Sequence, residues 1–408
     1  MELLSTLSMK EAKEKVRGIF QDLFLKAEEV SIWEAIDRVL AVDVISPINV
    51  PEFHRSTVDG YAVLSKDTNG ASESLPSFLD IVGEIEMGQE VNLEIKSGNT
   101  CYIPTGGMLP KGSDGVVMVE YTELLEEKTV CIQRPVAPLE NTLQKGDDLQ
   151  EGQVVFQKGH QLRSHDIGVL AGMGFATVEV YQKPRISIIS TGNELVSLEE
   201  ELQMGKIRDM NTYSLSAAAL QDHAMIVRAI IVKDHFDDLK AMLEKSIEDS
   251  DIVLISGGSS MGTKDITKDV INFVGEPGVF IHGIAVKPGK PTIVGKLGNV
   301  AVYGLPGQPV SAMVIYQVLV RDLIHSLYGI HKIQPYILGE LTVNISSNMG
   351  KEHYVMVNLT QEKNKTLVSP VYGKSGMLTM MAKSIGYICI EQNQEGLEKG
   401  SNVKVYLF

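Results

Sequence analysis

The chain has 408 residues, about three times the usual length of one domain, so we expect several domains and a sizeable core. Its 37 Lys and Arg residues are outnumbered by 52 Asp and Glu residues. The net charge of −15 argues against binding to nucleic acid or to an anionic membrane. Hydrophobic residues at 44% and charged residues at 22% are ordinary for a globular protein, which excludes global disorder or a fibre.

The cysteines and the N-terminal segment bear on the location of the protein. Cys101, Cys131 and Cys389 are too far apart, and odd in number, for a disulfide framework or a CxxC-type metal site. The segment MELLSTLSMKEAKEKV has no basic start and no long apolar stretch, and no uncharged apolar run approaches the ~20 residues of a membrane span. We therefore expect a cytoplasmic protein with no membrane partner.

Two capping boxes mark the N-terminal region. Ser8 with Glu11, and Ser31 with Glu34, have the spacing at which a Ser and a Glu satisfy each other's backbone donors, which predicts two helices. Trp33, the only tryptophan, is expected to anchor the core. We predict that 1–49 and 152–182 together form an elongated N-terminal domain.

The segment 50–151 has a different character. Short β-like runs such as DIVGEI, TCYIP and DGVVMVEY are separated by clusters of Gly, Pro, Asn and Asp. This pattern predicts an inserted, mainly β domain.

The segment 183–330 alternates strands with helices. The strands RISIIS, IVRAIIV, DIVLIS, PTIVG and VAVYG are interleaved with helices expected near 212–222, 236–248, 263–274 and 309–327. Such alternation predicts a doubly wound α/β domain with a largely parallel sheet. The last segment, 335–408, has β runs at hairpin-like intervals and predicts a small β-barrel, with a sandwich as the alternative. The predicted fold is therefore multidomain, α/β plus β.

Four loops of the α/β domain are expected to converge, because ligands bind outside the carboxyl ends of parallel strands. The loops are 191–194, 233–234, 257–265 and 305–309. Gly257, Gly258 and Gly262 allow backbone amides to approach an anion, and a helix start follows them. We interpret these loops as a phosphate cradle, although glycines in a βα loop also serve turns alone. A second helix starts at Pro309, and Ser311 adds a hydroxyl.

Carboxylates gather in the same predicted loops. Glu194, Asp234 and Asp265 share this sheet edge, and Asp59 lies in a loop of the β domain. Carboxylates near a phosphate repel it unless a hard cation lies between them, which indicates Mg²⁺. Helix capping is the alternative for Asp265. In the segment KPGKP, Lys287 and Lys290 present ammonium groups to a compact anion.

A competing motif occurs in the same region. The run from Gly258 to Gly262 matches G-x-S-x-G between a strand and a helix, the context of a hydrolase nucleophile, with Ser260 as its serine. Ser260 lies several residues beyond the strand, however, and is not on a sharp strand-to-helix turn. Serine hydrolysis therefore stays the weaker hypothesis. No GxxxxGK[ST], HExxH or complete GxGxxG is present.

Eight segments, in order through nearly the whole chain, together resemble the molybdopterin molybdenumtransferases, the family of MoeA and the gephyrin E-domain. They are PEFHRSTVDGYAV, PTGGMLPKGSDGVVMVE, KGDDLQEGQVVFQKG, STGNELV, GKIRDMN, SGGSSMGTKD, VKPGKPTIVG and GLPGQPVSA. The resemblance implies that molybdate is inserted into adenylyl-molybdopterin with Mg²⁺-dependent release of AMP. It also implies a homodimer whose cleft lies between subunits, and transient contacts with the adenylyltransferase and with molybdoenzymes. A non-catalytic dimeric scaffold of the same fold is the alternative.

The resemblance also assigns residues to roles. The catalytic set that it implies is Asp59, Thr105, Asp148, Glu194, Asp234, Asp265 and Lys287. Asp59, Asp234 and Asp265 are expected to bind Mg²⁺. The set expected to bind the pterin phosphate and the oxyanion is Thr191, Gly192, Ser256, Gly257, Gly258, Ser259, Gly262, Lys290, Pro306, Gly307, Pro309, Ser311 and Ser375.

Two positions depart from the family pattern. Gly283 follows His282 where many relatives have a lysine, and Met356 stands where relatives often have an arginine. The loss of two cations bears on the strength of oxyanion binding and on the choice between molybdate and tungstate.

Overall fold

The computed structural model describes residues 6–126, 128–257, 266–330, 334–377 and 379–408. The chain divides into two compact units. One consists of the residues up to Glu28 together with Tyr181–Phe408, and the other consists of Glu29–Val180.

The first predicted helix is confirmed. Helix α1 (Met9–Ile19) begins after Ser8, whose Oγ accepts a hydrogen bond from the Glu11 amide at 3.2 Å. The Glu11 carboxylate in turn accepts from the Ser8 amide at 2.8 Å, so both halves of the capping box form.

The predictions of a second helix and of a buried tryptophan are wrong. Only a 3₁₀ turn, η1 (Ile32–Glu34), follows Ser31, and Asp37 has a φ of 62°, which a continuing helix cannot adopt. So short a turn has no apolar face to bury, and Trp33 is 89% exposed. Ala35 and Leu40 enter the core of this region in its place.

The unit Glu29–Val180 contains a six-stranded sheet with the order β7-β4-β6-β5-β9-β8. Its strands are β4 (Gly60–Val63), β5 (Ser77–Glu84), β6 (Asn99–Ile103), β7 (Gly115–Met118), β8 (Thr122–Glu126) and β9 (Thr129–Ile132). The unit also contains helix α2 (Ser164–Gly172) and two-stranded ladders. The ladders pair β1 (Ala27–Ser31) with β12 (Thr177–Tyr181), β2 (Val44–Ile45) with β11 (Val154–Phe156), and β3 (Arg55–Ser56) with β10 (Thr142–Leu143).

The α/β domain is built on a six-stranded sheet with the order β16-β13-β17-β21-β20-β18. The strands are β13 (Arg185–Thr191), β16 (Met225–Val232), β17 (Ile252–Ser256), β18 (Pro277–His282), β20 (Ile293–Leu297) and β21 (Val300–Leu305). The first four in that order run parallel, as predicted. β20 runs antiparallel to both of its neighbours, β21 and β18, because the two residues between β20 and β21 allow a hairpin and no crossover.

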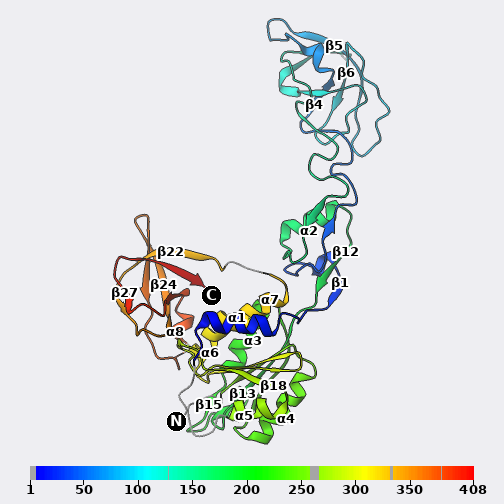
Figure 1. Cartoon of the computed structure of the whole chain (residues 1–408). Helices are drawn as coiled ribbons and strands as arrows, with labels where there is room; N and C mark the ends of the chain where they lie inside the picture. Colours follow the sequence, from blue (N-terminus) through cyan, green and yellow to red (C-terminus); the bar gives the residue numbers. More distant parts are fainter. Residues whose placement is uncertain (1–5, 127, 258–265, 331–333, 378) are drawn as a thin grey trace. The chain divides into compact units, whose positions relative to one another are not determined.

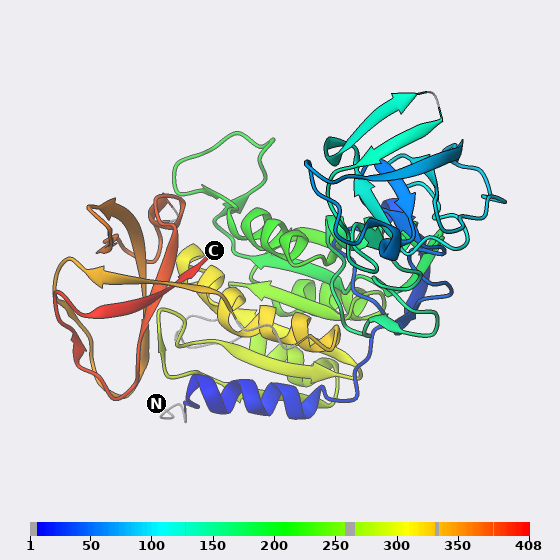
Figure 2. The same cartoon turned by 90° about the horizontal axis from the view of Figure 1, so that it is seen from above.

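Helices cover both faces of this sheet, which confirms the doubly wound prediction (Figures 1 and 2). Helices α4 (Phe236–Ile247) and α5 (Ile266–Val274) cover one face. Helices α3 (Asn211–Gln221), α6 (Pro309–Ile315) and α7 (Arg321–Leu327) lie on the other face together with α1.

The segment Pro309–Leu327 is long and apolar enough to span a membrane, with a mean hydropathy of 1.3. It consists of α6, a π-helical turn η4 (Tyr316–Val320) and α7. Because 72% of it is buried inside the protein, its apolar character is that of a core helix.

The C-terminal region is a closed barrel, and the sandwich alternative is therefore wrong. Its strands β22 (Tyr336–Leu341), β24 (Glu352–Glu362), β25 (Lys365–Pro370), β26 (Gly386–Ile390) and β28 (Asn402–Leu407) close through the β24–β26 pairing. Smaller elements are β23 (Ile345–Ser346), β27 (Gly396–Leu397) and α8 (Thr379–Ala382). The strand β19 (Val286–Lys287) leaves the α/β domain and pairs with β24, with Lys287 opposite His353.

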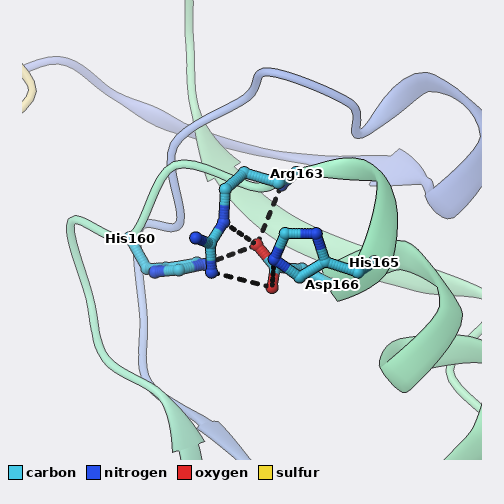
Figure 3. Close-up of polar contacts among 4 residues, drawn as sticks. All are labelled: His160, Arg163, His165 and Asp166. Atoms are coloured by element: carbon cyan, nitrogen blue, oxygen red, sulfur yellow. Dashed lines mark hydrogen bonds and ion pairs between the residues drawn. The ribbon is translucent and has the colours of Figure 1, made fainter.

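A buried ionic cluster organises the N-terminal end of α2 (Figure 3). The Asp166 carboxylate is only 2% exposed and accepts hydrogen bonds from His160 Nε2 at 2.8 Å and from Arg163 Nε at 3.1 Å. Burial alone raises the pKa of Asp166, but the hydrogen bonds from Arg163 and His160 outweigh it and hold that pKa well below its usual range. The cluster thus fastens the loop before α2 to the helix.

Asp166→Asn is expected to destabilise the unit Glu29–Val180 by about 2 kcal/mol, because it removes the charge that two partners share. For a unit of this size the loss lowers Tm by roughly 4–8 °C in calorimetry. His165→Gln is the control, since its side chain is 64% exposed and its 3.5 Å contact with Asp166 is not among the interactions that lower the pKa of Asp166. Because the pKa of Asp166 is lower in the folded state, its contribution is present above about pH 4 and disappears as the pH falls. An unchanged Tm in Asp166→Asn would contradict this role.

Candidate functional site

The carboxyl ends of three parallel strands meet at one level of the sheet. Ser190, Ser256 and Leu305 are paired across β13, β17 and β21, so the loops that follow these strands start side by side. A cavity of about 870 Å³ opens at this edge. The predicted residues that line it are Thr191, Glu194, Asp234, Ser256, Gly257, Lys287, Lys290, Pro306, Gly307, Pro309, Ser311 and Ser375.

Glycine is required where these loops touch. Gly257 has a φ of 111°, and a Cβ there would lie 2.2 Å from the Thr191 carbonyl oxygen. A Cβ at Gly307 would lie 3.5 Å from the Gly257 Cα, which shows how close the two loop backbones are. Larger residues at 257 would therefore push apart the loops that form the cavity wall.

The carboxylates of the sheet edge are held in different ways. Asp234 Oδ1 accepts a hydrogen bond from Thr191 Oγ1 at 2.7 Å, which couples the loops after β13 and β16. Glu194 is exposed, and its side chain folds back toward Gly192, where a Cβ would lie 2.9 Å from Glu194 Oε2. Gly192 itself lines the adjoining groove and not this cavity.

Cations also line the cavity. Lys287 and Lys290 come from the KPGKP segment, and Lys351 comes from the residue before β24. Burial first, and then Lys287 and Lys351, lower the pKa of His353 to about 4, so His353 adds no charge at neutral pH. The part of the cavity with these lysines suits an anion.

Hydroxyl groups line the cavity too. Ser311 is 4% exposed in the first turn of α6, and Ser375 lies at the rim of the barrel. The Ser375 carbonyl oxygen accepts a hydrogen bond from the Val310 amide at 3.1 Å, which ties the barrel to the start of α6. The barrel therefore supplies part of the cavity wall.

The sequence interpretation missed several residues of the cavity, among them one lysine, one aspartate and one asparagine. Lys351 belongs to no motif and reaches the cavity only because β19 pairs with β24. Asp209 and Asn211 also line it, and both are at least nine-tenths buried. They belong to the segment GKIRDMN, which contributed to the resemblance without a role for either residue.

The structure places three predicted residues in the unit Glu29–Val180. Asp59 Oδ1 accepts a hydrogen bond from the Thr105 amide at 2.7 Å, so these two residues are neighbours. Asp148 is exposed, and its amide donates to the Val50 carbonyl at 3.0 Å. Four other predicted residues lie outside the described part of the chain, as does Ser260: Gly258, Ser259, Gly262 and Asp265.

The two departures from the family pattern have structural explanations. Gly283 has a φ of 96°, which favours glycine over lysine. Met356 is 2% exposed and lines a smaller cavity of about 450 Å³ that adjoins Lys287 and Ser375. Within the described ranges, no group of three or more His, Cys, Asp or Glu side chains is placed to hold a metal ion.

The fold and the cavity define a class of protein: an α/β protein with attached β domains and a cavity suited to a small anionic ligand at the carboxyl edge of its sheet. Three family models match the chain: the MoeA N-terminal region (domain I and II) at 7–174, a "probable molybdopterin binding domain" at 187–326, and the MoeA C-terminal region (domain IV) at 339–408.

Individual relatives agree with these models. The molybdopterin molybdenumtransferase of Haemophilus influenzae is 33% identical over 94% of each chain, and that of Bacillus subtilis is 29% identical over 94% of this chain and 90% of its own. A crystal structure of a molybdopterin biosynthesis MoeA protein from Pyrococcus horikoshii matches with a TM-score of 0.83 and 33% identity over 99% of both chains. The chain belongs to the MoeA family of molybdopterin molybdenumtransferases.

Gly257→Ala is expected to lower Tm far more than Gly205→Ala. Both glycines have positive φ, 111° and 83°, and share that backbone cost of about 1 kcal/mol. Only at Gly257 would the new Cβ collide with backbone, whereas it meets nothing within 4 Å at Gly205. We expect an additional loss of about 2 kcal/mol or more for Gly257→Ala. Equal Tm values for the two variants would show that the loops separate without cost.

Proposed function

We propose that this chain is an enzyme of molybdenum cofactor biosynthesis that inserts molybdate into adenylyl-molybdopterin with Mg²⁺-dependent release of AMP. The observation that carries the proposal is the cavity, which is lined by both lysines and carboxylates, in a chain of this family. The homologues that share its full length are named for this activity.

The part of the cavity with the lysines is suited to the molybdate dianion. A tetrahedral oxyanion that leaves water needs positive charge and hydrogen-bond donors, which Lys287, Lys290, Lys351 and Ser311 supply. The Ser375 hydroxyl donates to Gln308 Oε1 and would have to exchange that acceptor for the ion. Lysines offer point charges without the planar geometry of arginine and so accept a tetrahedral ion in several orientations. Lys351 offsets one of the two cations that the family pattern has and this chain lacks.

The acidic residues suit Mg²⁺. Asp234 and Asp59 each use Oδ1 for a hydrogen bond, and within the described residues no hydrogen bond is made by their Oδ2 atoms. Magnesium usually takes one or two carboxylates and completes its shell with water and substrate phosphates, so a dense protein ligand set is unnecessary. When bound, Mg²⁺ would neutralise the charge of the adenylate phosphate. Thr191 and the Thr105 amide would hold the two carboxylates in place, with Asp265 as the third proposed ligand.

We infer a homodimer whose cleft combines Asp59, Thr105 and Asp148 of one subunit with the α/β cavity of the other. Asp59 and Asp234 belong to different units of the chain, which is compatible with such sharing. A cytoplasmic location and transient contacts with the adenylyltransferase and molybdoenzymes belong to the same proposal. All three cysteines are free thiols, as a reducing compartment would keep them.

The reaction is tested by incubating the protein with adenylyl-molybdopterin, Mg²⁺ and molybdate and measuring AMP by chromatography. AMP release is expected to fall roughly 100-fold in Asp234→Asn, because a carboxylate that positions the cation is lost. Asp238→Asn, an exposed change in the first turn of α4, is the matched control and should behave like the parent. Absence of AMP release from the parent would overturn the proposed activity.

The shared cleft is tested in the same assay with mixed subunits. Asp59→Asn and Asp234→Asn are each expected to be inactive, but after subunit exchange one site in each mixed dimer regains both carboxylates. In a two-fold symmetric dimer this restores about a quarter of the parental AMP release. A site built within one subunit would regain none, and that result would contradict the shared cleft.

Lys351→Gln is expected to weaken molybdate binding roughly tenfold in calorimetry, because one charge-assisted contact is removed. Lys399→Gln, an exposed lysine of the same barrel, is the control and should leave the affinity unchanged. If Lys351→Gln binds molybdate as tightly as the parent, the barrel does not contribute charge to the site.

A further inference from the structure

Two hydrogen-bond acceptors at the cavity wall have no partner. Asp209 is 3% exposed and Asn211 is 7% exposed, and both line the 870 Å³ cavity. Asp209 Oδ2 and Asn211 Oδ1 are buried side-chain oxygens that accept no hydrogen bond from any residue that the structure describes. Because an unpaired buried acceptor is costly, each such oxygen in a native protein calls for an explanation.

The orientation of Asp209 is determined by its other oxygen. Asp209 Oδ1 accepts hydrogen bonds from Ser190 Oγ and from the Thr212 amide, both at 3.1 Å. The neighbouring Arg208 instead donates to the Leu198 carbonyl at 2.7 Å. Among the described residues no Lys or Arg forms an ion pair with Asp209, so its second oxygen is held in place and lacks a donor.

The orientation of Asn211 is determined as well. Its Nδ2 donates to Ser256 Oγ at 2.6 Å and to the Gly307 carbonyl at 2.8 Å, which uses both amide hydrogens. Oδ1 is therefore an acceptor and cannot exchange places with Nδ2 without losing both bonds. Two fixed acceptors thus lie two residues apart in one segment, at a cavity that lysines also line.

A buried water can satisfy such acceptors, and a ligand that replaces it must be a cation or carry N–H or O–H donors, because an anion would be repelled. Both oxygens are buried, so any ligand must displace the wall slightly, and a magnesium ion that keeps several of its waters needs the larger space. A flat heterocycle with adjacent N–H groups needs no such room. The aminopyrimidinone ring of a pterin carries those donors on its 2-amino group and ring nitrogen.

We propose that Asp209 and Asn211 bind the N–H donors of the pterin ring and so determine which heterocycle the enzyme accepts. This inference rests on the proposed function and extends it to the residues that recognise the pterin. With the ring at Asp209 and Asn211, the anionic groups of the substrate lie toward Lys287 and Lys290. Asp209 and Asn211 therefore also orient the substrate within the cavity.

The experiment compares two fluorescent probes, pterin and lumazine, which differ in that lumazine has a carbonyl in place of the 2-amino group. The parent protein is expected to bind pterin roughly 30-fold or more tightly, since lumazine sets an acceptor against an acceptor. In Asp209→Asn the preference should fall to near unity, because the new amide can donate to that carbonyl. Glu201→Gln, which changes an exposed carboxylate of the adjoining groove, should retain the parental preference.

Asp209→Asn keeps an acceptor for Ser190 and Thr212. Its molybdate affinity, measured by calorimetry, reports whether the part of the cavity with Lys287 and Lys290 has kept its structure. With that affinity intact, an unchanged preference for pterin overturns the inference. So does a parent protein that binds both probes equally or binds neither. Loss of Mn²⁺ binding in Asp209→Asn, detected by electron paramagnetic resonance with the preference unchanged, would instead make Asp209 a cation ligand.

The test of the proposed function is independent of the test of pterin recognition. If the parent releases AMP but shows no selectivity through Asp209, the reaction stands and the recognition by Asp209 and Asn211 fails. If selectivity through Asp209 is found but no AMP is released, the recognition stands and the reaction fails.

Discussion

The carbonyl oxygen of Thr191 lies almost where a side chain at position 257 would begin, and the cavity depends on this contact. The ends of β13 and β17 can come so close only because residue 257 is glycine and adopts a φ of 111°. The same approach places Gly307 against Gly257, and Asn211 then donates to the Gly307 carbonyl at 2.8 Å. The loops after three strands and the start of α3 are thereby joined into one wall.

The polarity of the cavity follows from which elements reach it. Parallel pairing of β19 with β24 brings the barrel against the α/β domain, so that Lys351 joins Lys287 and Lys290. The segment before α3 also reaches the cavity, with the acceptor oxygens of Asp209 and Asn211. A substrate with an anionic end and a donor-bearing ring can satisfy the lysines and these acceptors in one orientation only. Such complementarity gives specificity beyond what the buried area provides.

The clustering of a few lysines at the cavity reconciles the acidic composition of the protein with the proposed anionic substrate. A net charge of −15 keeps polyanions away from most of the surface, while a few lysines create a local positive region. The low pKa of His353 follows from burial and from those same lysines. The two family cations that this chain lacks are explained differently, since Gly283 serves a backbone conformation and Met356 is buried against a smaller cavity.

Much of the site could be predicted from the sequence because its parts are local. The capping box at Ser8, the alternation of strands with helices, and the glycine loops each depend on residues close in the chain, and parallel strands bring their loops to one edge by geometry alone. The eight motifs, in their order along the chain, were enough to indicate the family.

Other features depend on contacts between distant segments, which local patterns do not report. Trp33 sits in a capping sequence yet is exposed, because the chain turns at Asp37 before a helical face can form. Lys351 belongs to no motif, and Asp209 was distinguished only by burial and an unpaired oxygen. The sequence by itself determined the elements, their order and the loops that carry the glycines and KPGKP lysines. Only the tertiary structure decided the polarity of the cavity and its unpaired acceptors, because these arise from strand pairing and burial between residues far apart in the chain.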